Sequence, residues 1–561
     1  MFINFVILVV ELVVQVIAAS SSEKPHIVLI IADDLGWNDV GFHGSNEIPT
    51  PNIDALAYNG LILNRHYTQS SCTPSRAALL TGKYPIRMGL QGSPIAEGVP
   101  IGVPLKEKLL PQYLKELGYR TGLIGKWHLG SFKNEFTPNE RGFDSFFGCY
   151  NGWARFNDSV CGSTFISNMT GIDARANFEK AGDRFKGRYS TDVYTEEAVN
   201  VIRKHDRKVP LFLDVSYTAV HAIPKGIVQV KNITETEERF AHIKDPNRRL
   251  LAGALTTLDE SVGKIIHALH QNKMLNNSIV IFMSDNGGST FEVPGLAGVF
   301  QNFASNWPLR GMKGVISEGA IRCAAAIWSP MIRRREVIQG KMHLVDWLPT
   351  FHEAAGGNSS QLGRIDGVSQ WEFWKNSEVK SPRSRFLVNI NEVTHDEAFI
   401  MGKWKYARSK RSTSLKYGGY AGRDEELSYN LTLVLRSPVH KVLKRYSEKR
   451  FNEKEFLVLR KKADIAAQGS CKNRTQTFDS EVLPCFSTGC LFNIKKDPCE
   501  MVDLSALHPA VVKNIKNALQ VYEKELVPQQ NCTKDYRANP KNFDNYWTPW
   551  IQTQPTTCAG L

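Results

Sequence analysis

The chain has 561 residues, a net charge of +13 and a hydrophobic fraction of 42%. That fraction allows a large buried core and excludes disorder along the whole chain. The basic residues are scattered and form no single arm or stripe, so the charge is weak evidence for an anionic partner. A chain of this length corresponds to two to four domains.

The first residues predict entry into the secretory pathway. Residues 2–19 are mostly apolar, although Glu11 and Gln15 interrupt them, and small residues follow. This pattern is typical of a cleaved signal peptide at 1–19, and Glu11 argues against the alternative of a transmembrane anchor. No later segment is apolar enough to span a membrane. We therefore expect a secreted or lysosomal protein without a membrane anchor.

Four continuous apolar runs predict strands that are buried on both faces of a sheet. They are Ile27–Ala32, Thr121–Ile124, Leu211–Val215 and Ile279–Met283. Helical patterns lie between them at Leu109–Leu117 and Leu251–Leu269. Strands that alternate with helices predict an α/β fold with a large, mostly parallel sheet flanked by helices.

Polar side chains follow all four strands. They are Asp33, Asp34, Lys126, His128, His221, Asp285 and Asn286. An aspartate after a strand often only caps a helix, and a lone histidine is often an ordinary core or surface residue. However, the carboxyl ends of parallel strands share one edge of the sheet, where ligands bind. We therefore predict a functional site at this edge.

The side chains at this edge divide into two chemical types. The oxygen donors Asp33, Asp34, Asp285 and Asn286 suit a hard cation, Ca²⁺ or Mg²⁺, rather than zinc or copper. The other groups, together with Lys313 further along the chain, are cations or proton carriers. Facing a bound oxyanion, they would neutralise charge and transfer protons.

Residues 71–82 predict a cysteine at the start of a helix. Pro74 suits a first helical turn, and Gly82 suits the helix end. Cys72 therefore lies where the helix dipole favours an anion, and Arg76 is close enough to support it. The alternative, a buried half-cystine, would require neither the proline nor the arginine at these offsets.

The segment Cys72-Thr73-Pro74-Ser75-Arg76, followed by Leu80-Thr81-Gly82, resembles the signature of the sulfatase family. The resemblance extends through residues 32–45, 125–130, 220–221, 284–288 and 309–314. The sequences of these motifs are most similar to those of the arylsulfatase B branch, and the similarity includes residues 497–505. The resemblance implies that the cysteine is oxidised in the endoplasmic reticulum to formylglycine (3-oxoalanine). The maturation partner would be the formylglycine-generating enzyme.

The resemblance also implies the site residues. One Ca²⁺ would be held by Asp33, Asp34, Asp285, Asn286 and the modified Cys72. Catalytic roles would fall to Cys72, Arg76, Lys126, His128, His221 and Lys313. The hydrated aldehyde would attack sulfur through one hydroxyl, and its second hydroxyl, deprotonated by His128, would let sulfate leave. Arg76 and Lys126 would hold the formylglycine, while His221 and Lys313 would bind sulfate and assist the leaving oxygen.

The implied fold is that of alkaline phosphatase and the sulfatases. We expect a catalytic domain at 24–380 and a smaller C-terminal α+β domain at 381–561 with an antiparallel sheet. Phe386–Ala407 predicts two short strands around a polar turn. Lys441–Lys462 predicts a charged helix, more consistent with a solvated surface than with a polymer-binding one. The resemblance suggests a packed helix at Val511–Leu526.

Two segments depart from the family pattern. Ala320 stands where a second glycine is usual, and it would be strained if that position needs a positive φ. Residues 92–104 lack the cysteine pair of arylsulfatase B relatives and are expected at the substrate rim. Tyr150 and Trp153 could stack on a substrate there, although ordinary packing is the favoured interpretation.

The sequence leaves the substrate open between a small-molecule sulfate, of the aryl sulfate or plant glucosinolate type, and a sulfated glycosaminoglycan sugar. No nucleic-acid partner is expected. Two alternatives to a sulfatase are a phosphatase or phosphodiesterase of the same superfold and an inactive extracellular binder of sulfated ligands. The Cys72 motif and the lack of a histidine-rich two-zinc set argue against the first, and the intact site argues against the second.

Two further patterns concern the secretory route. Eight Asn-x-Ser/Thr sequons are candidates for glycosylation: Asn157, Asn168, Asn232, Asn276, Asn358, Asn430, Asn473 and Asn531. Ten cysteines would allow five disulfides, but conversion of Cys72 leaves nine, so at least one stays unpaired. Cys490 and Cys499 are a reasonable pair, and Cys323 is the candidate free thiol.

Overall fold

The structure is a computed structural model, and it describes residues 24–162, 168–290, 300–410, 427–447, 452–469, 471 and 483–551. Two predictions lie outside these residues. They are the signal peptide at 1–19 and the sequon at Asn473. Within the described residues, each helix is too short or too polar to cross a bilayer.

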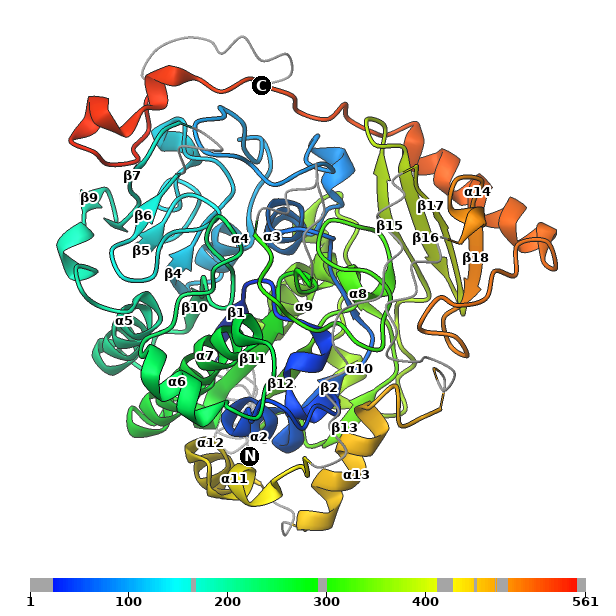
Figure 1. The fold of residues 1–561 in the computed structure, drawn as a ribbon, viewed down its shortest axis with the longest axis horizontal. Helices are drawn as coiled ribbons and strands as arrows, with labels where there is room; N and C mark the ends of the chain where they lie inside the picture. Colours follow the sequence, from blue (N-terminus) through cyan, green and yellow to red (C-terminus); the bar gives the residue numbers. More distant parts are fainter. Residues whose placement is uncertain are drawn as a thin grey trace, which may run out of the picture.

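A ten-stranded sheet forms the centre of the molecule (Figure 1). Its middle strands β11 (Ser278–Ser284), β1 (His26–Ala32), β10 (Leu211–Ser216), β4 (Arg120–Lys126) and β5 (Ser145–Cys149) are neighbours in this order and run parallel. The outer strands are β13 (Glu336–Ile338), β2 (Leu61–Leu63), β12 (Ala325–Trp328), β8 (Arg175–Ala176) and β9 (Glu179–Lys180). The four predicted strands are thus confirmed, side by side, in a sheet with a parallel centre.

Two layers of helices cover the sheet. Along β1, Ile27, Leu29 and Ile31 enter one hydrophobic cluster while the residues between them enter the other, as the alternation of side chains along a strand requires. The first face carries α3 (Cys72–Thr81), α4 (Leu110–Glu116), α9 (Trp347–Ala354) and α10 (Trp371–Lys375). The second carries α2 (Pro51–Asn59), α5 (Ser190–Lys204), α7 (Pro246–Gln271), α11 (Leu431–Arg436) and α12 (Pro438–Leu443).

A second, antiparallel sheet lies beside the first layer. Its strands are β15 (Arg385–Asn391), β16 (Asp396–Met401), β17 (Trp404–Arg408) and β18 (Cys490–Asn493), and α14 (Pro509–Glu523) packs on it. The prediction over Phe386–Ala407 was right in placing strands on both sides of a polar turn, which are β15 and β16, but it missed a third strand. Gly402, with a φ of 58°, makes a tight turn that divides the second run into β16 and β17.

The stretch Lys441–Lys462 is not one helix. α12 ends at Leu443, a short 3-10 turn follows at Lys444–Tyr446, and α13 begins at Glu453 and ends at Ala463. The apolar side chains of α12 and α13 pack on the second face of the large sheet, so this segment belongs to the same core as α2 and α7.

The two sheets share one buried core. Phe399, Tyr406 and Leu491 of the antiparallel sheet lie in the same cluster as Leu29 and Ile281 of the large sheet. A buried ion triad joins them as well. The Lys405 ammonium lies 3.2 Å from a Glu318 oxygen and 2.7 Å from a Glu500 oxygen, and none of the three side chains is exposed.

Two disulfides have both cysteines within the described residues, and they join Cys471 to Cys499 and Cys485 to Cys490. The predicted pair Cys490–Cys499 is therefore wrong: a turn brings Cys485 within 5.0 Å of Cys490, measured between Cα atoms, at the start of β18. Cys323 is a buried free thiol, as predicted. The other free thiols among the described residues are Cys72, Cys149 and Cys161.

Candidate active site

The carboxyl ends of four adjacent strands bring the predicted polar residues together. Asp33 and Asp34 follow β1, Lys126 ends β4, and His221 lies in the loop after β10. Asp285 and Asn286 follow β11. All of these side chains are buried. The prediction of one shared edge is confirmed for these six positions.

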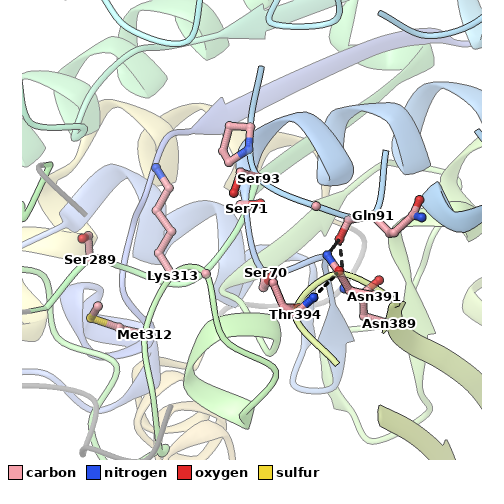
Figure 2. A pocket seen from close by; sticks show the side chains of 13 residues that line it. Ser70, Ser71, Gln91, Ser93, Ser289, Met312, Lys313, Asn389, Asn391 and Thr394 are labelled. Carbon is pink, nitrogen blue, oxygen red and sulfur yellow. Dashed lines mark hydrogen bonds between the residues drawn. The ribbon is translucent and has the colours of Figure 1, made fainter. Parts of the chain in front are cut away.

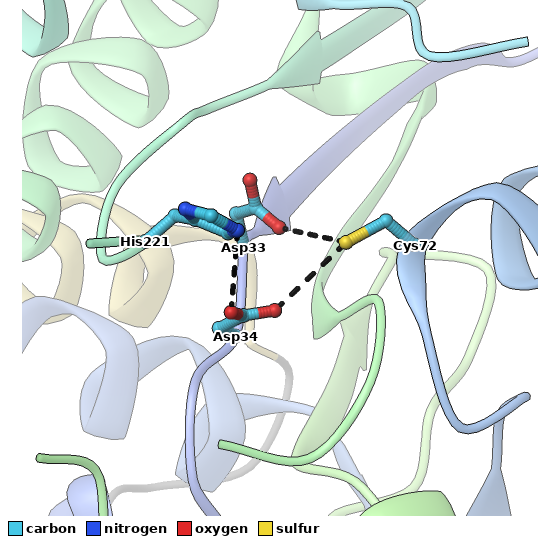
Figure 3. A group of neighbouring side chains, drawn as sticks. All are labelled: Asp33, Asp34, Cys72 and His221. Carbon is cyan, nitrogen blue, oxygen red and sulfur yellow. Dashed lines mark hydrogen bonds and ion pairs between the residues drawn. The ribbon is translucent and has the colours of Figure 1, made fainter. Parts of the chain in front are cut away.

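Cys72 enters this cluster from the start of α3 (Figure 3). Ser71 before it is extended, and Gly82 closes the helix with a φ of 66°, in the left-handed region that glycine favours. The Cys72 Sγ lies 3.5 Å from Asp33 Oδ1 and 3.9 Å from Asp34 Oδ1. Burial raises the pKa of this thiol to about 12, so the unmodified cysteine is a poor nucleophile.

Each carboxylate of the cluster faces a cation. Lys126 Nζ lies 2.7 Å from Asp33 Oδ2, and Arg76 Nη2 lies 3.1 Å from Asp285 Oδ2. Arg76 also donates to the Lys126 carbonyl at 3.1 Å, so it links α3 to the end of β4. Burial raises the pKa of Asp33 to about 7 despite Lys126, because neighbouring carboxylates add to the desolvation. The protein's own cations therefore do not fully offset this negative charge.

Lys313 bridges the other carboxylate to a histidine. Its Nζ lies 2.7 Å from Asp34 Oδ2 and 3.1 Å from His221 Nε2. Burial would raise the pKa of Asp34, but Lys313 and His221 outweigh it and lower that pKa to about 2. Burial and Lys313 lower the pKa of His221 to about 3. His221 Nδ1 lies 2.6 Å from the Ala222 carbonyl, which can only accept a hydrogen bond, so we assign the ring proton to Nδ1. The other nitrogen, Nε2, then accepts a hydrogen bond from Lys313. The ammonium is the proton-bearing group of this pair.

His128 has one free nitrogen. Its Nε2 lies 2.9 Å from the Ile95 carbonyl, which can only accept, so Nε2 carries the proton. The Nδ1 atom is buried without a hydrogen-bond partner. Burial and the Lys126 charge lower the pKa of this imidazole well below its usual value. His128 therefore offers a neutral Nδ1 that can take up a proton.

The cluster fits a hard cation. The side-chain oxygen Oδ1 of Asn286 is buried without a partner, while its Nδ2 donates to Asp34 Oδ1 at 2.7 Å. Ligand atoms of Asp33, Asp34, Cys72 and His221 all lie within 4.8 Å of one another. The cluster thus contains an amide oxygen without a partner and carboxylates whose negative charge the neighbouring lysines and arginine do not fully neutralise. Oxygen ligands of this kind are those that a hard divalent cation prefers.

Backbone conformation at the site is unusual in two places. Asp34 has a φ of 60° and His128 a φ of 59°, a region that residues other than glycine rarely adopt. Gly152 lies against the His128 ring, where an added Cβ would come within 2.3 Å of the ring. Such conformations cluster at functional sites because surrounding contacts hold them in place.

The predicted strain at Ala320 is wrong. This residue lies in the short helix α8 (Glu318–Ile321), and its φ is not positive. The glycine that the fold needs is Gly319, where a Cβ would meet the backbone oxygens of Arg310 and Gly311 at 2.6 Å. A methyl group at position 320 instead joins the buried core.

A pocket leads from the surface to Lys313 (Figure 2). Its empty space, including its mouth, is ≈ 570 Å³. Gly92, Ser93 and Pro94 line it, as expected for the rim segment 92–104. Tyr150 and Trp153 are buried, which confirms the packing interpretation.

Sequence reasoning missed several contributors. Asn389, Asn391 and Thr394 reach the pocket from β15 and the turn after it. Thr73 donates to the His128 carbonyl at 3.0 Å, and Asn302 donates to the Asp34 carbonyl at 2.9 Å. Thr73 belongs to the signature segment, although no pattern in the sequence indicates its contact with His128. The other positions follow none of the four predicted strands, and only the tertiary fold brings them to the site.

Comparisons with known proteins agree with this geometry. The family model described as Sulfatase matches residues 25–357. The chain is 34% identical over 543 residues to mouse arylsulfatase J, covering 95% of this chain and 82% of that protein. It is 32% identical to human N-acetylgalactosamine-6-sulfatase over 63% of this chain and 66% of that protein.

Among solved structures, the crystal structure of Ps i-CgsB matches with a TM-score of 0.67 and 26% identity, covering 90% of this chain and 94% of that one. The same protein in complex with k-i-k-neocarrahexaose matches equally well. The chain therefore belongs to the sulfatase family, whose members are sulfuric ester hydrolases that act through a formylglycine.

Proposed function

We propose that the residues at the strand ends hold one Ca²⁺ beside a formylglycine at position 72 and cleave a sulfate ester there. The ligands would be Asp33, Asp34, Asp285, Asn286 and the modified Cys72. Supporting this set are the oxygen-rich donors and the unpartnered Asn286 oxygen. When bound, the hydrated formylglycine supplies the nucleophilic hydroxyl, and the cation supplies positive charge beside it.

Calcium removal provides a test that does not depend on activity. We expect chelation to lower the melting temperature and added Ca²⁺ to restore it, because a ligand at 100 times its Kd stabilises the fold by about 2.7 kcal/mol. Mg²⁺ should restore less, since it prefers fewer protein ligands. An Asn286→Ala variant should show a smaller Ca²⁺-dependent shift. A melting temperature that changes neither with the chelator nor with added Ca²⁺ would contradict the proposal.

The cations of the cluster would bind and polarise the sulfate group. Lys126 and Lys313 are buried ammonium groups, and Lys313 reaches the pocket. Placed in a site without bulk water, they would oppose the charge that develops on the sulfuryl oxygens. Lys313 would deliver a proton to the leaving oxygen, since His221 is held neutral with Nε2 as an acceptor.

Two other residues would act on the formylglycine itself. Arg76 would fix the nucleophile's surroundings by tying α3 to Asp285 and to the Lys126 carbonyl. His128 would remove a proton from the hydrate through its neutral Nδ1. The fixed tautomer of His128 supports this role, because only a nitrogen without a proton can act as the base.

The pocket lining favours a substrate in which an uncharged sugar carries or adjoins the sulfate. Ser70, Ser93, Asn391 and Thr394 offer neutral polar groups, and Lys313 is the one charged side chain among the described lining residues. No aromatic side chain is among the described lining residues to stack on an aryl ring, and a uronate carboxylate would meet no cation beyond the one facing sulfate. The relatives named N-acetylgalactosamine-6-sulfatase and the neocarrahexaose complex agree with a carbohydrate.

One experiment tests both the chemistry and the substrate. The tryptic peptide 66–76 from secreted protein should have the mass of the formylglycine form rather than of cysteine. A panel of aryl sulfate, glucosinolate, sulfated N-acetylgalactosamine and sulfated uronate should give the highest kcat/KM where an uncharged sugar is present. Unmodified cysteine from a competent host would contradict the mechanism, and preference for the aryl sulfate or the uronate would contradict the substrate assignment.

We propose that the chain passes through the secretory pathway to the cell exterior or the lysosome. Two disulfides support an oxidising compartment. All seven sequon asparagines within the described residues are exposed, which suits glycosylation. We also propose a boundary near residue 380, where the chain leaves α10 and enters β15. The catalytic part would then be 24–380.

A further inference from the structure

Two cavities lie on either side of one segment, Val442–Tyr446, far from the candidate active site. The first has an empty space of ≈ 1180 Å³, its mouth included, and lies between the loop after β12, residues 443–447 and Glu455. The second has an empty space of ≈ 1370 Å³, its mouth included, and lies between α7 and α12. Leu443 and Tyr446 line the first cavity, Val442 and Arg445 line the second, and the Tyr446 hydroxyl lies 2.7 Å from Nδ1 of His270, which also lines the second. We call the two together the basic groove.

Basic side chains dominate the lining of the basic groove. They are Arg333, Arg334, Arg335, Lys264, Arg436, Lys441 and Arg445. The acidic side chains of the lining are Glu455 and Glu260, so the lining carries a net charge of +5 out of +13 for the chain. The apparent scatter of basic residues in the sequence thus hides a concentration in space.

Part of this charge is already paired and part is exposed. Arg334 lies 2.6 Å from Glu336, and Lys264 lies 3.4 Å from Asp192. Arg335 contacts the Ser447 hydroxyl, and burial lowers its pKa. By contrast, Arg436, Lys441 and Arg445 are exposed along the second cavity. The groove therefore combines guanidinium groups at its walls with exposed cations along its length.

The basic groove lies at the opposite end of the sheet from the candidate active site. Trp328, at the end of β12, pairs with Val280 near the start of β11, whereas Asp285 follows the end of β11. The seven residues of β11 span about 23 Å. A group bound in the groove is therefore not the group whose sulfate is cleaved.

We propose that the basic groove binds a sulfated polysaccharide chain, and so holds the enzyme on a polyanionic glycan while the active site stays free. Guanidinium forks match sulfate and carboxylate groups in two-point geometry. Single-stranded nucleic acid is disfavoured because its bases need aromatic faces to stack on, and the Tyr446 ring already packs against His270 and Trp328, at interplanar angles of 90° and 77°. Binding at the groove requires no assumption about the substrate.

The test compares two triple variants that remove equal charge. One is Arg436→Gln, Lys441→Gln and Arg445→Gln in the groove. The matched control is Lys495→Gln, Lys513→Gln and Lys524→Gln, exposed positions on the side of the antiparallel sheet. Binding to heparin is measured against salt concentration, with single-stranded DNA and anionic vesicles as comparison ligands.

We expect the groove variant to bind heparin about tenfold more weakly, with a shallower salt dependence, because fewer ions are released on binding. The control should bind as the wild type does. Turnover of a small aryl sulfate and the melting temperature should be unchanged in both, since none of the six residues lies at the active site. Equal losses in the two variants, or wild-type binding to DNA or vesicles as tight as to heparin, would overturn the proposal.

Discussion

Replacing Cys72 by serine is expected to abolish multiple turnover, with a loss on the order of 10⁶-fold, the scale seen when a nucleophile is removed. A serine has one hydroxyl, whereas the hydrated formylglycine has two. A serine that accepted a sulfate would have no second hydroxyl through which to release it. The variant should therefore transfer at most one sulfate per chain, which mass spectrometry of the intact protein measures.

The matched control is Cys323→Ser. Both cysteines are buried and neither forms a disulfide. Whereas Cys72 contacts the carboxylates of Asp33 and Asp34, the Cys323 sulfur lies 3.3 Å from the Thr68 hydroxyl. A hydroxyl at position 323 keeps a polar partner there, so the free energy of unfolding should change by only about 1 kcal/mol. Activity should stay within a few-fold of the wild type. Repeated turnover by Cys72→Ser would contradict the formylglycine mechanism.

Replacing Lys313 by methionine is expected to lower kcat by about 10²- to 10³-fold, the usual cost of one group that stabilises transition-state charge. Methionine fills similar space but carries no charge and no proton. The loss also removes the cation that lowers the pKa of Asp34. That pKa should rise, so Asp34 would become protonated at higher pH, and the acid limb of the activity profile should move upward.

Lys313→Arg separates charge from proton donation. The guanidinium keeps the positive charge beside Asp34 and so should leave the acid limb near its wild-type position, but it is a far weaker proton donor than an ammonium. We therefore expect binding of substrate to be retained and kcat to stay low. A Lys313→Met variant with wild-type kcat and an unshifted pH profile would remove Lys313 from the mechanism.

The parts of the fold that the sequence predicts are those set by local pattern. β1 and β11 are built on continuous apolar runs, and β4 and β10 are mostly apolar with Asp214 inside β10. Burial on both faces leaves such runs few other structures. Their polar ends converge because parallel strands share an edge. Cys72 could be placed at a helix start because Pro74 and Gly82 mark the two ends of α3.

What could not be predicted depends on contacts between distant segments. Asn391 and Thr394 line the pocket only because the antiparallel sheet packs beside the rim segment 92–104, where Asn391 donates to the Gln91 carbonyl. No pattern in the neighbouring sequence predicts this. The cysteine pairing failed for a similar reason, since sequence spacing does not give the turn that brings Cys485 to Cys490. The tautomers of His128 and His221 depend on carbonyls that only the folded chain supplies.

The shared core of the two sheets has a consequence for how this chain can change over time. Lys405 of the antiparallel sheet is buried between Glu318, at the start of α8, and Glu500. Loss of Lys405 would leave these two buried carboxylates without the ammonium that lies between them. The C-terminal part is therefore not a module that recombination could exchange for another. New specificities in this lineage would instead arise by point changes at the β15–β16 turn and in the rim loop, where side chains reach the pocket without supporting the core.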